Sequence, residues 1–533
     1  MEFDYVVVGA GSAGCALAAR LSENGRHTVA LVEAGGRDRS PWIHVPVGYF
    51  KTMGNPKTDW RYRTEADPGL NGRSLAWPRG RVLGGSSSIN GLLYVRGQRE
   101  DYDRWRQMGC TGWGWDDVAP LFRRAESWEG GENAERGGGG PLAVSRTRLS
   151  RPAVDRWVEA AEAAGYRRNP DYNGGDQEGV GLYQLTARDG RRCSAAVAYL
   201  RPARRRPNLA VLTGLQTARV RFRDDRAVGI EARRERGGET VAIHARAEVI
   251  LCAGAIGSPQ ILMLSGIGPA DHLGEHGIAV RRHAPGVGGN LQDHLQARPV
   301  LRVRSSTINT ETRSLVQRGL IGLEYATRRT GAMTMAASLG YGFLKTRPEL
   351  ATPDIQFHVQ PFSTDTIGTE THPFDAITTS VLQLRPESRG HLRLRSADPA
   401  DHPLIHPNYL ATPLDCQTIV EGVRVARRIA RHEPLRSEVV SEHAPGEGIA
   451  DEDDAAILDW VRNTATTIYH PTGTCRMGAD EASVIDPQLR VRGVESLRVA
   501  DCSIMPEIVS ANTNAPAIMI GERASDLVQS EEG

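Results

Sequence analysis

Two segments near the C-terminus contain residues that could carry acid–base chemistry. His470 lies in Tyr469-His470-Pro471-Thr472-Gly473, and Asn512 follows in Ser510-Ala511-Asn512-Thr513-Asn514. An imidazole has an ordinary pKa near 6.5, so it can accept a hydroxyl proton at neutral pH. A neutral asparagine amide can donate a hydrogen bond to an oxygen that gains negative charge. Because the chain has 15 histidines, residue type alone does not single out His470.

A glycine-rich turn near the N-terminus is typical of a dinucleotide site. Gly9-Ala10-Gly11-Ser12-Ala13-Gly14 follows the apolar stretch Tyr5–Val8, and Glu33 comes nineteen residues after the last glycine. The first glycine permits a tight turn, the second lets backbone approach a pyrophosphate, and the third allows close helix packing. The helix N-terminus attracts phosphate, and Glu33 would accept hydrogen bonds from an adenosine ribose. The pattern predicts dinucleotide binding but does not decide between NAD and FAD.

Composition excludes several classes of protein. The 533 residues include 65 Lys+Arg and 64 Asp+Glu, which gives a net charge of +1. Because cations do not form a long cluster, the chain has no electrostatic footprint for nucleic acid, and we predict a small-molecule partner. With 40% hydrophobic residues the chain is not disordered. The seven cysteines are scattered without CxxC or zinc-like spacing, so we predict no metal site and a reducing, cytoplasmic location.

Because a strand is expected almost at once, at Tyr5–Val8, we expect no secretory signal before it. The apolar run Val249–Ala270 is interrupted by glycines and prolines. We therefore predict a strand, a turn and a buried helix there instead of a membrane span. Periodicity further predicts a helix over 13–22, a strand over 28–33, antiparallel strands between 210 and 252, and a final helix over 515–528. Gly137–Gly140 is expected to be a plain flexible surface loop.

Two further segments decide which cofactor is expected. Gly80-Arg81-Val82-Leu83-Gly84-Gly85-Ser86-Ser87-Ser88-Ile89-Asn90-Gly91 combines glycines, serines and an amide, and a second run extends from Gly254 to Gly268. With the N-terminal turn, they closely resemble the signature sequences of the glucose-methanol-choline (GMC) family of FAD-dependent oxidoreductases. Residues 469–478 are similar to the block that holds that family's catalytic histidine. The resemblance covers essentially the whole chain and is closest to the bacterial choline-dehydrogenase-like and alcohol-dehydrogenase-like branch.

The resemblance implies a mixed α/β (α+β) fold with two domains. A Rossmann-like FAD-binding domain is expected from the discontinuous segments 1–150, 195–300 and 471–533. A substrate-binding domain with an antiparallel sheet and helices is expected from 151–194 and 301–470.

The resemblance also implies the residues that contact FAD. Asp501 is expected at the ribityl or phosphate region, Val220 and Ala253-Gly254 along the nucleotide, and the helix that starts near Asn514 beside the reduced flavin's negative charge. Some family members attach FAD covalently through a histidine at the position of Ile89, so we predict non-covalent FAD here. The predicted cofactor-binding residues are Gly9, Gly11, Ser12, Ala13, Gly14, Glu33, Ala34, Arg81, Gly84, Gly85, Ser86, Asn90, Gly91, Leu92, Val220, Ala253, Gly254, Asp501 and Asn514.

The implied reaction is oxidation of an alcohol to an aldehyde or ketone by hydride transfer to flavin N5. His470 is the predicted base, Asn512 its partner at the substrate oxygen, and Tyr469 a pocket residue. Electrons would pass to a quinone-type acceptor or to O2. His294, in a segment that also looks family-like, is assigned a structural role.

Several alternatives stay open at this stage. The family fold also hosts lyases that cleave cyanohydrins with a redox-silent FAD, and a choline- or sugar-specific dehydrogenase fits the same motifs. The N-terminal turn alone would also suit an NAD dehydrogenase, and a non-catalytic flavoprotein is a further reading. No cluster of aromatics and carboxylates between 300 and 470 suggests a quaternary-ammonium cage. Peripheral membrane association and the oligomeric state are left open.

Overall fold

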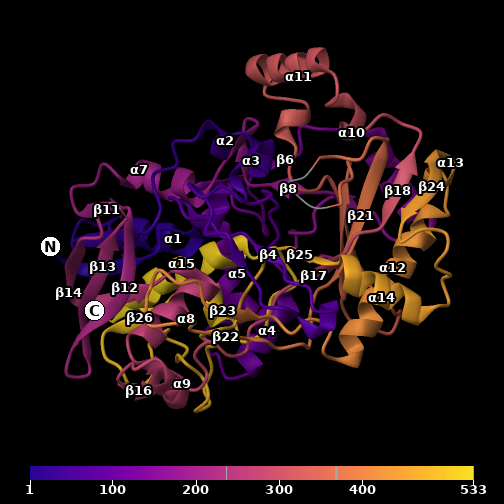
Figure 1. Cartoon of the computed structure of the whole chain (residues 1–533). Coiled ribbons are helices and arrows are strands. Elements are labelled where there is room, and N and C mark those ends of the chain that lie inside the picture. Colours follow the sequence, from indigo (N-terminus) through magenta and orange to yellow (C-terminus); the bar gives the residue numbers. More distant parts are fainter. Residues whose placement is uncertain (236, 366–369, 532–533) are drawn as a thin grey trace.

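The N-terminal strand β1 (Glu2–Val8) lies inside a seven-stranded sheet (Figure 1). The computed structural model describes residues 1–235, 237–365 and 370–531. The parallel part contains β11 (Leu209–Thr213), β2 (Val29–Glu33), β1, β14 (Thr240–Leu251) and β26 (Leu497–Val499). Strands β13 (Arg226–Arg234) and β12 (Leu215–Arg223) add an antiparallel extension to β14, which confirms the strands predicted between 210 and 252. The central strands are buried, as apolar runs in a parallel sheet require.

A second, eight-stranded sheet is antiparallel throughout its described pairs. Its strands β19, β20 and β21 are buried along their whole lengths. In Figure 1 helices α12 (Pro413–Ala430) and α14 (Asp454–Thr464) lie beside this sheet. The strands, in order across the sheet, are β24 (Val439–Ala444), β18 (Val300–Val303), β21 (Ala376–Gln383), β20 (Ile355–Gln360), β19 (Gly340–Leu344) and β7 (Gly179–Leu182), with β17 (Leu295–Ala297) on β21 and β25 (Thr466–Thr467) on β17.

Other elements connect and cover these sheets. Residues of β17, which sequence analysis assigned to the FAD-binding part, pair with the second sheet instead. The longer helices are α1 (Ser12–Leu21), α4 (Arg99–Gln107), α5 (Trp115–Ala125), α6 (Pro152–Ala163), α8 (Gly254–Leu264), α11 (Leu315–Arg328) and α15 (Asn514–Ser530). Shorter elements include α2 (Pro41–His44), α3 (Tyr49–Thr52), α7 (Arg201–Ala203), α9 (Ala270–Glu275), α10 (Ile308–Glu311), α13 (Leu435–Glu438), β5 (Glu126–Trp128), β6 (Leu142–Arg146), β8 (Gln184–Leu185), β22 (His391–Arg393) and β23 (Leu404–His406).

Helices α1 and α15, the first long and the last helix of the chain, pack side by side in parallel. At their N-terminal ends the Ser12 hydroxyl donates to Asn514 Oδ1 at 2.7 Å. Eight residues further along each helix, the Arg20 guanidinium donates to the carboxylate of Glu522 at 3.0–3.1 Å. A Cβ on Gly521 would lie 2.4 Å from the Ala13 carbonyl oxygen, so only glycine permits this approach. The two helices therefore begin at the same place.

The glycine run at 137–140 differs from the expected plain surface loop. Arg136 is fully buried and pairs with Glu126 and Asp171, each at 2.6 Å. A Cβ on Gly137 would lie 1.9 Å from the Arg123 carbonyl oxygen, and one on Gly140 would lie 2.3–2.4 Å from backbone atoms of the preceding helix. Two of these glycines are thus needed for close packing around a buried ion-pair network.

The apolar run Val249–Ala270 forms the end of β14, a turn and helix α8, as predicted. Among the described residues, no helix combines the length and apolarity needed to cross a bilayer.

The buried carboxylate of Glu522 gives a test of the α1–α15 contact. It also accepts a hydrogen bond from the Tyr199 hydroxyl at 2.7 Å and pairs with Arg124 at 2.8 Å. We expect Glu522→Gln to lower the free energy of unfolding by about 2–4 kcal/mol, because it leaves two guanidinium groups without their shared anion. Asp526→Asn removes only the half-exposed partner of Arg124 and should cost less than about 0.5 kcal/mol. Equal losses in denaturant unfolding of both variants would contradict this account.

Candidate active site

One cavity is lined by residues from both sheets. Its walls include the ends of β1 and β2, the start of α1, the loop at 78–93, strand β20, and the starts of α8 and α15. Most of the residues singled out from the sequence meet here. These are Gly9, Gly11, Ser12, Glu33, Ala34, Gly85, Ser86, Asn90, Gly91, Leu92, Ala253, Gly254, Tyr469, His470, Asp501, Asn512 and Asn514.

Five predicted cofactor residues do not line this cavity. They are Ala13, Gly14, Arg81, Gly84 and Val220. Gly14 lies within α1, where a Cβ would sit 2.0 Å from the Gly9 carbonyl oxygen, so its role is close packing. Gly84 has a φ of +88° and forms the turn before the serine run. The guanidinium of Arg81 pairs with Glu235 at 2.9 Å and stacks 4.8 Å above Trp60.

Strand β12 reaches the cavity with residues other than the predicted one. Leu215, Gln216 and Thr217 line it, whereas Val220 lies further along the strand and donates its backbone N–H to Ser265 Oγ at 2.8 Å. The apolar alternation of β12 identifies the strand, but the point where it meets the cavity depends on its antiparallel pairing with β13.

The Glu33 carboxylate connects the glycine turn after β1 with the turn after β2. It accepts hydrogen bonds from the backbone N–H groups of Ala10 at 3.0 Å and Gly35 at 2.8 Å. Burial raises the pKa of Glu33 to about 7, against the opposing effect of these hydrogen bonds. Each oxygen keeps a free lone pair that could accept a ribose hydroxyl.

The N-termini of α1 and α15 both open on the cavity. Ser12 and Asn514 are their first residues, and both line it. A Cβ on Gly11 would meet no protein atom within 4 Å, while a Cβ on Gly85 would lie 2.7 Å from the Gly11 Cα. The two loops therefore touch, yet leave space beside Gly11. Two converging helix N-termini favour a bound anion.

The buried side chain of Arg192 holds two of the loops around the cavity. The buried Arg192 guanidinium donates to carbonyl oxygens of Ile43, Ser87 and Asn90 at 2.7–3.1 Å and to the Asn90 side chain at 2.6 Å. Burial lowers its pKa to about 9. Sequence analysis gave Arg192 no role, because its partners lie about 100 residues or more away in the chain.

Asp501 is bound by donors of the protein itself. Its carboxylate accepts from the Gly254 N–H at 2.8 Å, the Ser258 hydroxyl at 2.6 Å and the Ser503 N–H at 2.8 Å. The carboxylate thus lies at the N-terminus of α8, and burial raises its pKa. Its expected contact with a ribityl or phosphate group stays a prediction.

His470 and Asn512 lie next to each other, as predicted. Asn512 Nδ2 is 3.3 Å from His470 Nε2. The Tyr183 hydroxyl donates to the Phe357 carbonyl oxygen at 3.0 Å, so it accepts from Gln356 Nε2 at 2.7 Å. That same amide nitrogen donates to Asn512 Oδ1 at 3.1 Å. The Asn512 NH2 group is therefore oriented toward His470, whose Nε2 accepts.

His294 fixes the opposite side of the His470 ring. His294 Nε2 lies 2.9 Å from the Leu384 carbonyl oxygen, which can only accept, so this nitrogen carries a hydrogen. In a neutral ring His294 Nδ1 is then an acceptor, and it lies 3.0 Å from His470 Nδ1. His470 must carry its hydrogen on Nδ1 and keep a lone pair on Nε2. His294 thus has a positioning contact beyond the structural role expected for it.

Burial keeps these imidazoles neutral. It lowers the pKa of His470 well below its ordinary value, and the neighbouring His294, His358 and Arg79 act in the same direction. Burial also lowers the pKa of His294 to about 4 and that of His358 to about 3. A neutral His470 is the protonation state that a general base needs.

The backbone at His470 is held as firmly as its ring. Its N–H donates to Asp293 Oδ1 at 2.7 Å, and Asp293 Oδ2 accepts from the hydroxyls of Thr467 and Tyr409. Tyr469 has a φ of +68°, and its carbonyl oxygen accepts from Arg79 at 2.8 Å. The adjacent residues Asp293 and His294 therefore fix the main chain and the side chain of the same histidine.

Strand β20 supplies polar lining residues that sequence analysis did not identify. Gln356, His358 and Gln360 alternate along it, and the last two line the cavity together with Gln296. Gln360 Nε2 donates to the Ala337 carbonyl oxygen at 2.9 Å, which leaves Gln360 Oε1 buried without a partner. Gln296 Oε1 and His358 Nε2 also lack partners. The polar period of two in a buried strand is the signal that could have revealed them.

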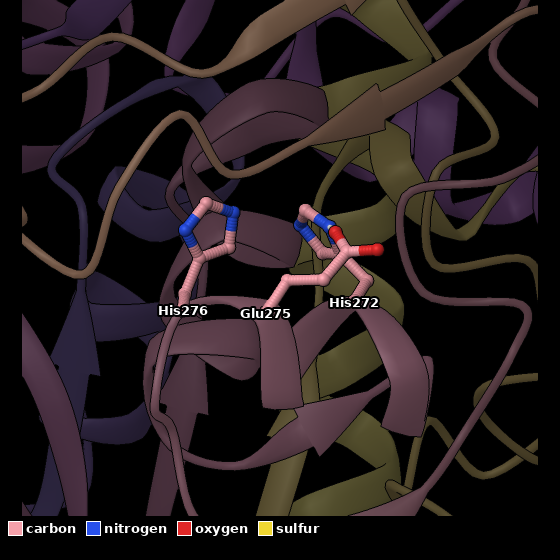
Figure 2. A group of neighbouring side chains, drawn as sticks. All are labelled: His272, Glu275 and His276. Carbon is pink, nitrogen blue, oxygen red and sulfur yellow. Dashed lines mark ion pairs between the residues drawn. The ribbon is translucent and has the colours of Figure 1, made fainter.

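A group of histidine and glutamate side chains with the spacing of metal ligands lies outside this cavity. Figure 2 shows His272, Glu275 and His276. Their candidate ligand atoms all lie within 4.8 Å of one another. The Leu394 backbone N–H donates to His272 Nε2 at 2.9 Å, so the neutral ring carries its hydrogen on Nδ1, 3.4 Å from the Glu275 carboxylate. Because a metal at Nδ1 would need the lone pair that this tautomer lacks, we assign no metal centre here.

The chain is similar in sequence to known oxidoreductases over almost its whole length. Residues 3–296 and 386–521 match two family models that are both described as GMC oxidoreductase. The alcohol dehydrogenase [acceptor] of Pseudomonas putida is 43% identical over 528 residues, which cover 99% of this chain and 95% of that protein. The mitochondrial choline dehydrogenase of Mus musculus is 44% identical over 541 residues, with 99% and 89% covered.

Solved structures with a similar fold cover almost the whole length of this chain. A pyridoxine 4-oxidase from Mesorbium loti has 31% identity and a TM-score of 0.89, with 99% of each chain covered. A formate oxidase of Aspergillus oryzae RIB40, in a structure concerned with FAD modification, has 28% identity and a TM-score of 0.91, with 99% and 98% covered.

The neutral imidazoles predict how stability depends on pH. Unfolded histidines bind protons below about pH 6.5, whereas the folded rings stay neutral to about pH 4 or 3, so stability falls as pH falls through this window. We expect His358→Gln to reduce the slope of unfolding free energy against pH by up to about 1.4 kcal/mol per pH unit between pH 6.5 and 4. Unfolding of the purified protein over this range measures it. His244→Gln, at an exposed ring, is the control, and an unchanged slope in His358→Gln would contradict the neutral assignment.

Proposed function

This chain belongs to the GMC oxidoreductase family, and we propose that His470 removes the hydroxyl proton of an uncharged alcohol during FAD-dependent oxidation in the cavity. One observation carries this proposal. Hydrogen bonds that start at two carbonyl oxygens, of Phe357 and Leu384, both require an unprotonated Nε2 on His470. Of the two ring nitrogens of His470, the one that can accept a proton is thus Nε2, beside the Asn512 amide.

The residues around the cavity fit FAD. Gly11 leaves open space next to the N-terminus of α1, where a pyrophosphate would be held by backbone N–H groups and the helix dipole. Glu33 has acceptor oxygens for the adenosine ribose. The N-terminus of α15 adds a second positive helix dipole beside that of α1. Ile89 is buried in the lining and cannot form a covalent bond to flavin, which supports non-covalent attachment. When bound, FAD supplies the hydride acceptor for the carbinol carbon.

The chain's own residues then handle the proton. His470 Nε2 accepts the hydroxyl proton and becomes an imidazolium, while its Nδ1–H stays hydrogen-bonded to His294. The Asn512 NH2 group donates to the substrate oxygen as negative charge grows there. Since Asp293 and His294 hold His470 from two directions, the base needs little reorganisation. His294 is a positioning residue in this mechanism.

The lining near His470 favours an uncharged alcohol with a second hydrogen-bond donor. Of the described lining residues, the carboxylates are Glu33 and Asp501, and both are bound to backbone N–H groups. A quaternary ammonium would find no free anion there, and attraction to aromatic faces would have to suffice. The unpartnered oxygens of Gln296 and Gln360 instead match hydroxyl donors.

We propose the two-domain division given by the sequence, with β17 moved to the substrate-binding part because it pairs with the second sheet. The electron acceptor is proposed to be a quinone or O2. An anaerobic screen of alcohols for flavin bleaching, followed by reoxidation with air or with a quinone, identifies both substrate and acceptor. Bleaching by an alcohol also separates oxidation from cyanohydrin cleavage, in which flavin stays oxidised.

Loss of the base should slow reduction and leave cofactor binding intact. We expect His470→Ala to reduce the rate of alcohol-driven flavin reduction by about 10²–10⁴-fold in anaerobic stopped flow, with the flavin spectrum retained. His244→Ala, at an exposed histidine, should match the wild type. Unchanged reduction by His470→Ala would exclude it as the base.

The open space at Gly11 tests where the dinucleotide lies. Gly11 has a φ of −80°, which valine can adopt, and no protein atom surrounds its Cβ position. We expect Gly11→Val to weaken FAD binding by about 10–100-fold, from about 1–3 kcal/mol of overpacking against the ligand, without destabilising the apoprotein. Fluorescence titration of the apoprotein with FAD measures the affinity. Gly139→Val, exposed and also unobstructed, is the control. Wild-type affinity in Gly11→Val would place the dinucleotide elsewhere.

A further inference from the structure

Helix α11 (Leu315–Arg328) stands apart from both sheets. Figure 1 shows it at the top of the molecule, projecting away from the body. The Ser314 hydroxyl caps its first turn by accepting from the Gln317 N–H. Tyr325 is buried against the body and donates its hydroxyl hydrogen to the Gly190 carbonyl oxygen at 3.1 Å. Ile321, on the same side of the helix, is partly buried and also packs against the core.

The apolar face of α11 points outward. Leu315 is 80% exposed, Val316 72%, Leu320 57% and Leu323 60%. At 100° per residue these four side chains fall within one side of the helix, about 140° wide, which they share with small or uncharged residues. The buried Tyr325 lies on the opposite side. A helix of a globular protein normally turns its apolar side to the core, so the arrangement in α11 is inverted.

Arginines accompany this apolar face on the rest of the helix and at its ends. Arg313 precedes the helix and Arg329 follows its last turn. Arg318 and Arg328 lie on the side of the helix away from the apolar residues, one on either side of Tyr325. Within the described part of the chain, none of these arginines forms an ion pair, and the single acidic residue of α11 is Glu324. An exposed apolar side on a helix whose polar side carries arginines is the pattern of a helix that lies in the surface of an anionic bilayer.

We propose that α11 docks this protein on an anionic lipid surface, with Leu315, Val316, Leu320 and Leu323 inserted among the headgroups. A second copy of the chain is the less suitable occupant. A helix of 14 residues is about 21 Å long and about 10 Å wide, so its face covers roughly 200 Å², against about 800 Å² per partner in a stable dimer. Apolar insertion combined with basic residues supplies the two signals that reversible membrane anchoring needs.

The docking helix connects directly to the cavity wall. Residues 329–336 lead from α11 to Ala337, which lines the cavity and donates its backbone N–H to the Gly91 carbonyl oxygen at 3.1 Å. At the start of this connection, Arg329 packs against Gly190, where a Cβ would lie 2.3 Å from the Arg329 carbonyl oxygen. A bilayer at α11 would therefore contact the molecule through a segment that continues into the active site.

Vesicle flotation of the FAD-loaded enzyme tests the proposal. We expect partitioning onto phosphatidylcholine vesicles with one-third phosphatidylglycerol to exceed that onto pure phosphatidylcholine by about 10-fold or more, and to weaken with added salt. Leu320→Ser with Leu323→Ser should reduce partitioning by about 10-fold or more. Arg318→Gln with Arg328→Gln should reduce it on the anionic vesicles only, by about 5-fold per arginine.

The control removes exposed apolar residues elsewhere. Val280→Ser with Val440→Ser, at side chains 45% and 51% exposed, should bind vesicles like the wild type. The flavin spectrum and alcohol oxidation in solution should be unchanged in every variant, which shows that the fold is intact. Absence of wild-type binding, or equal binding by the leucine variant, would overturn the proposal. So would a concentration-dependent dimer, seen by analytical ultracentrifugation, that the leucine substitutions dissociate without any effect on vesicles.

Discussion

The hydrogen bond between Ser12 and Asn514 joins the first residues of two helices that are 502 positions apart in the chain. Because α1 and α15 run in parallel from this point, their N–H-bearing ends open on one cavity. The contact depends on glycine at 521, where any side chain would meet the Ala13 carbonyl oxygen, and is held at its far end by the buried Glu522 carboxylate. The nucleotide site is thus complete only when the C-terminal helix α15 has packed against the N-terminal helix α1.

The region around His470 depends on a different constraint. Two networks of hydrogen-bonded side chains fix which atom donates and which accepts at each step. Both networks start at a main-chain carbonyl oxygen, which can only accept, and both end at His470. The direction of every hydrogen bond between them follows from that fact. Burial adds a second control, since it keeps three imidazoles neutral in one cluster. Base strength and ring orientation therefore arise from the fold around His470 rather than from a carboxylate partner.

Local patterns in the sequence were sufficient to predict most helices and strands. They were also sufficient to predict the glycines whose role depends on the backbone. The glycine turn, the strand ends and the paired His470 and Asn512 all came from motifs whose spacing is short or whose family resemblance is specific. Positions set by pairing between distant segments were not accessible. Thr217 instead of Val220 reaches the cavity because of how β12 pairs with β13, and His294 meets His470 across 176 residues. The outward apolar face of α11 could not be read from periodicity, which gives an apolar side but not its direction.

Charge is distributed unusually around the cavity. Burial raises the pKa of Glu33 to about 7 and lowers that of His470, so ionisable groups in the lining tend toward their neutral forms. Negative charge that develops in such an enclosed site is then stabilised mainly by fixed dipoles, which are the Asn512 amide and the neighbouring starts of α15 and α1. Fixed dipoles need no counterion and little rearrangement during the reaction. Since an uncharged alcohol brings no charge of its own into this setting, its oxidation is the chemistry that these walls suit best.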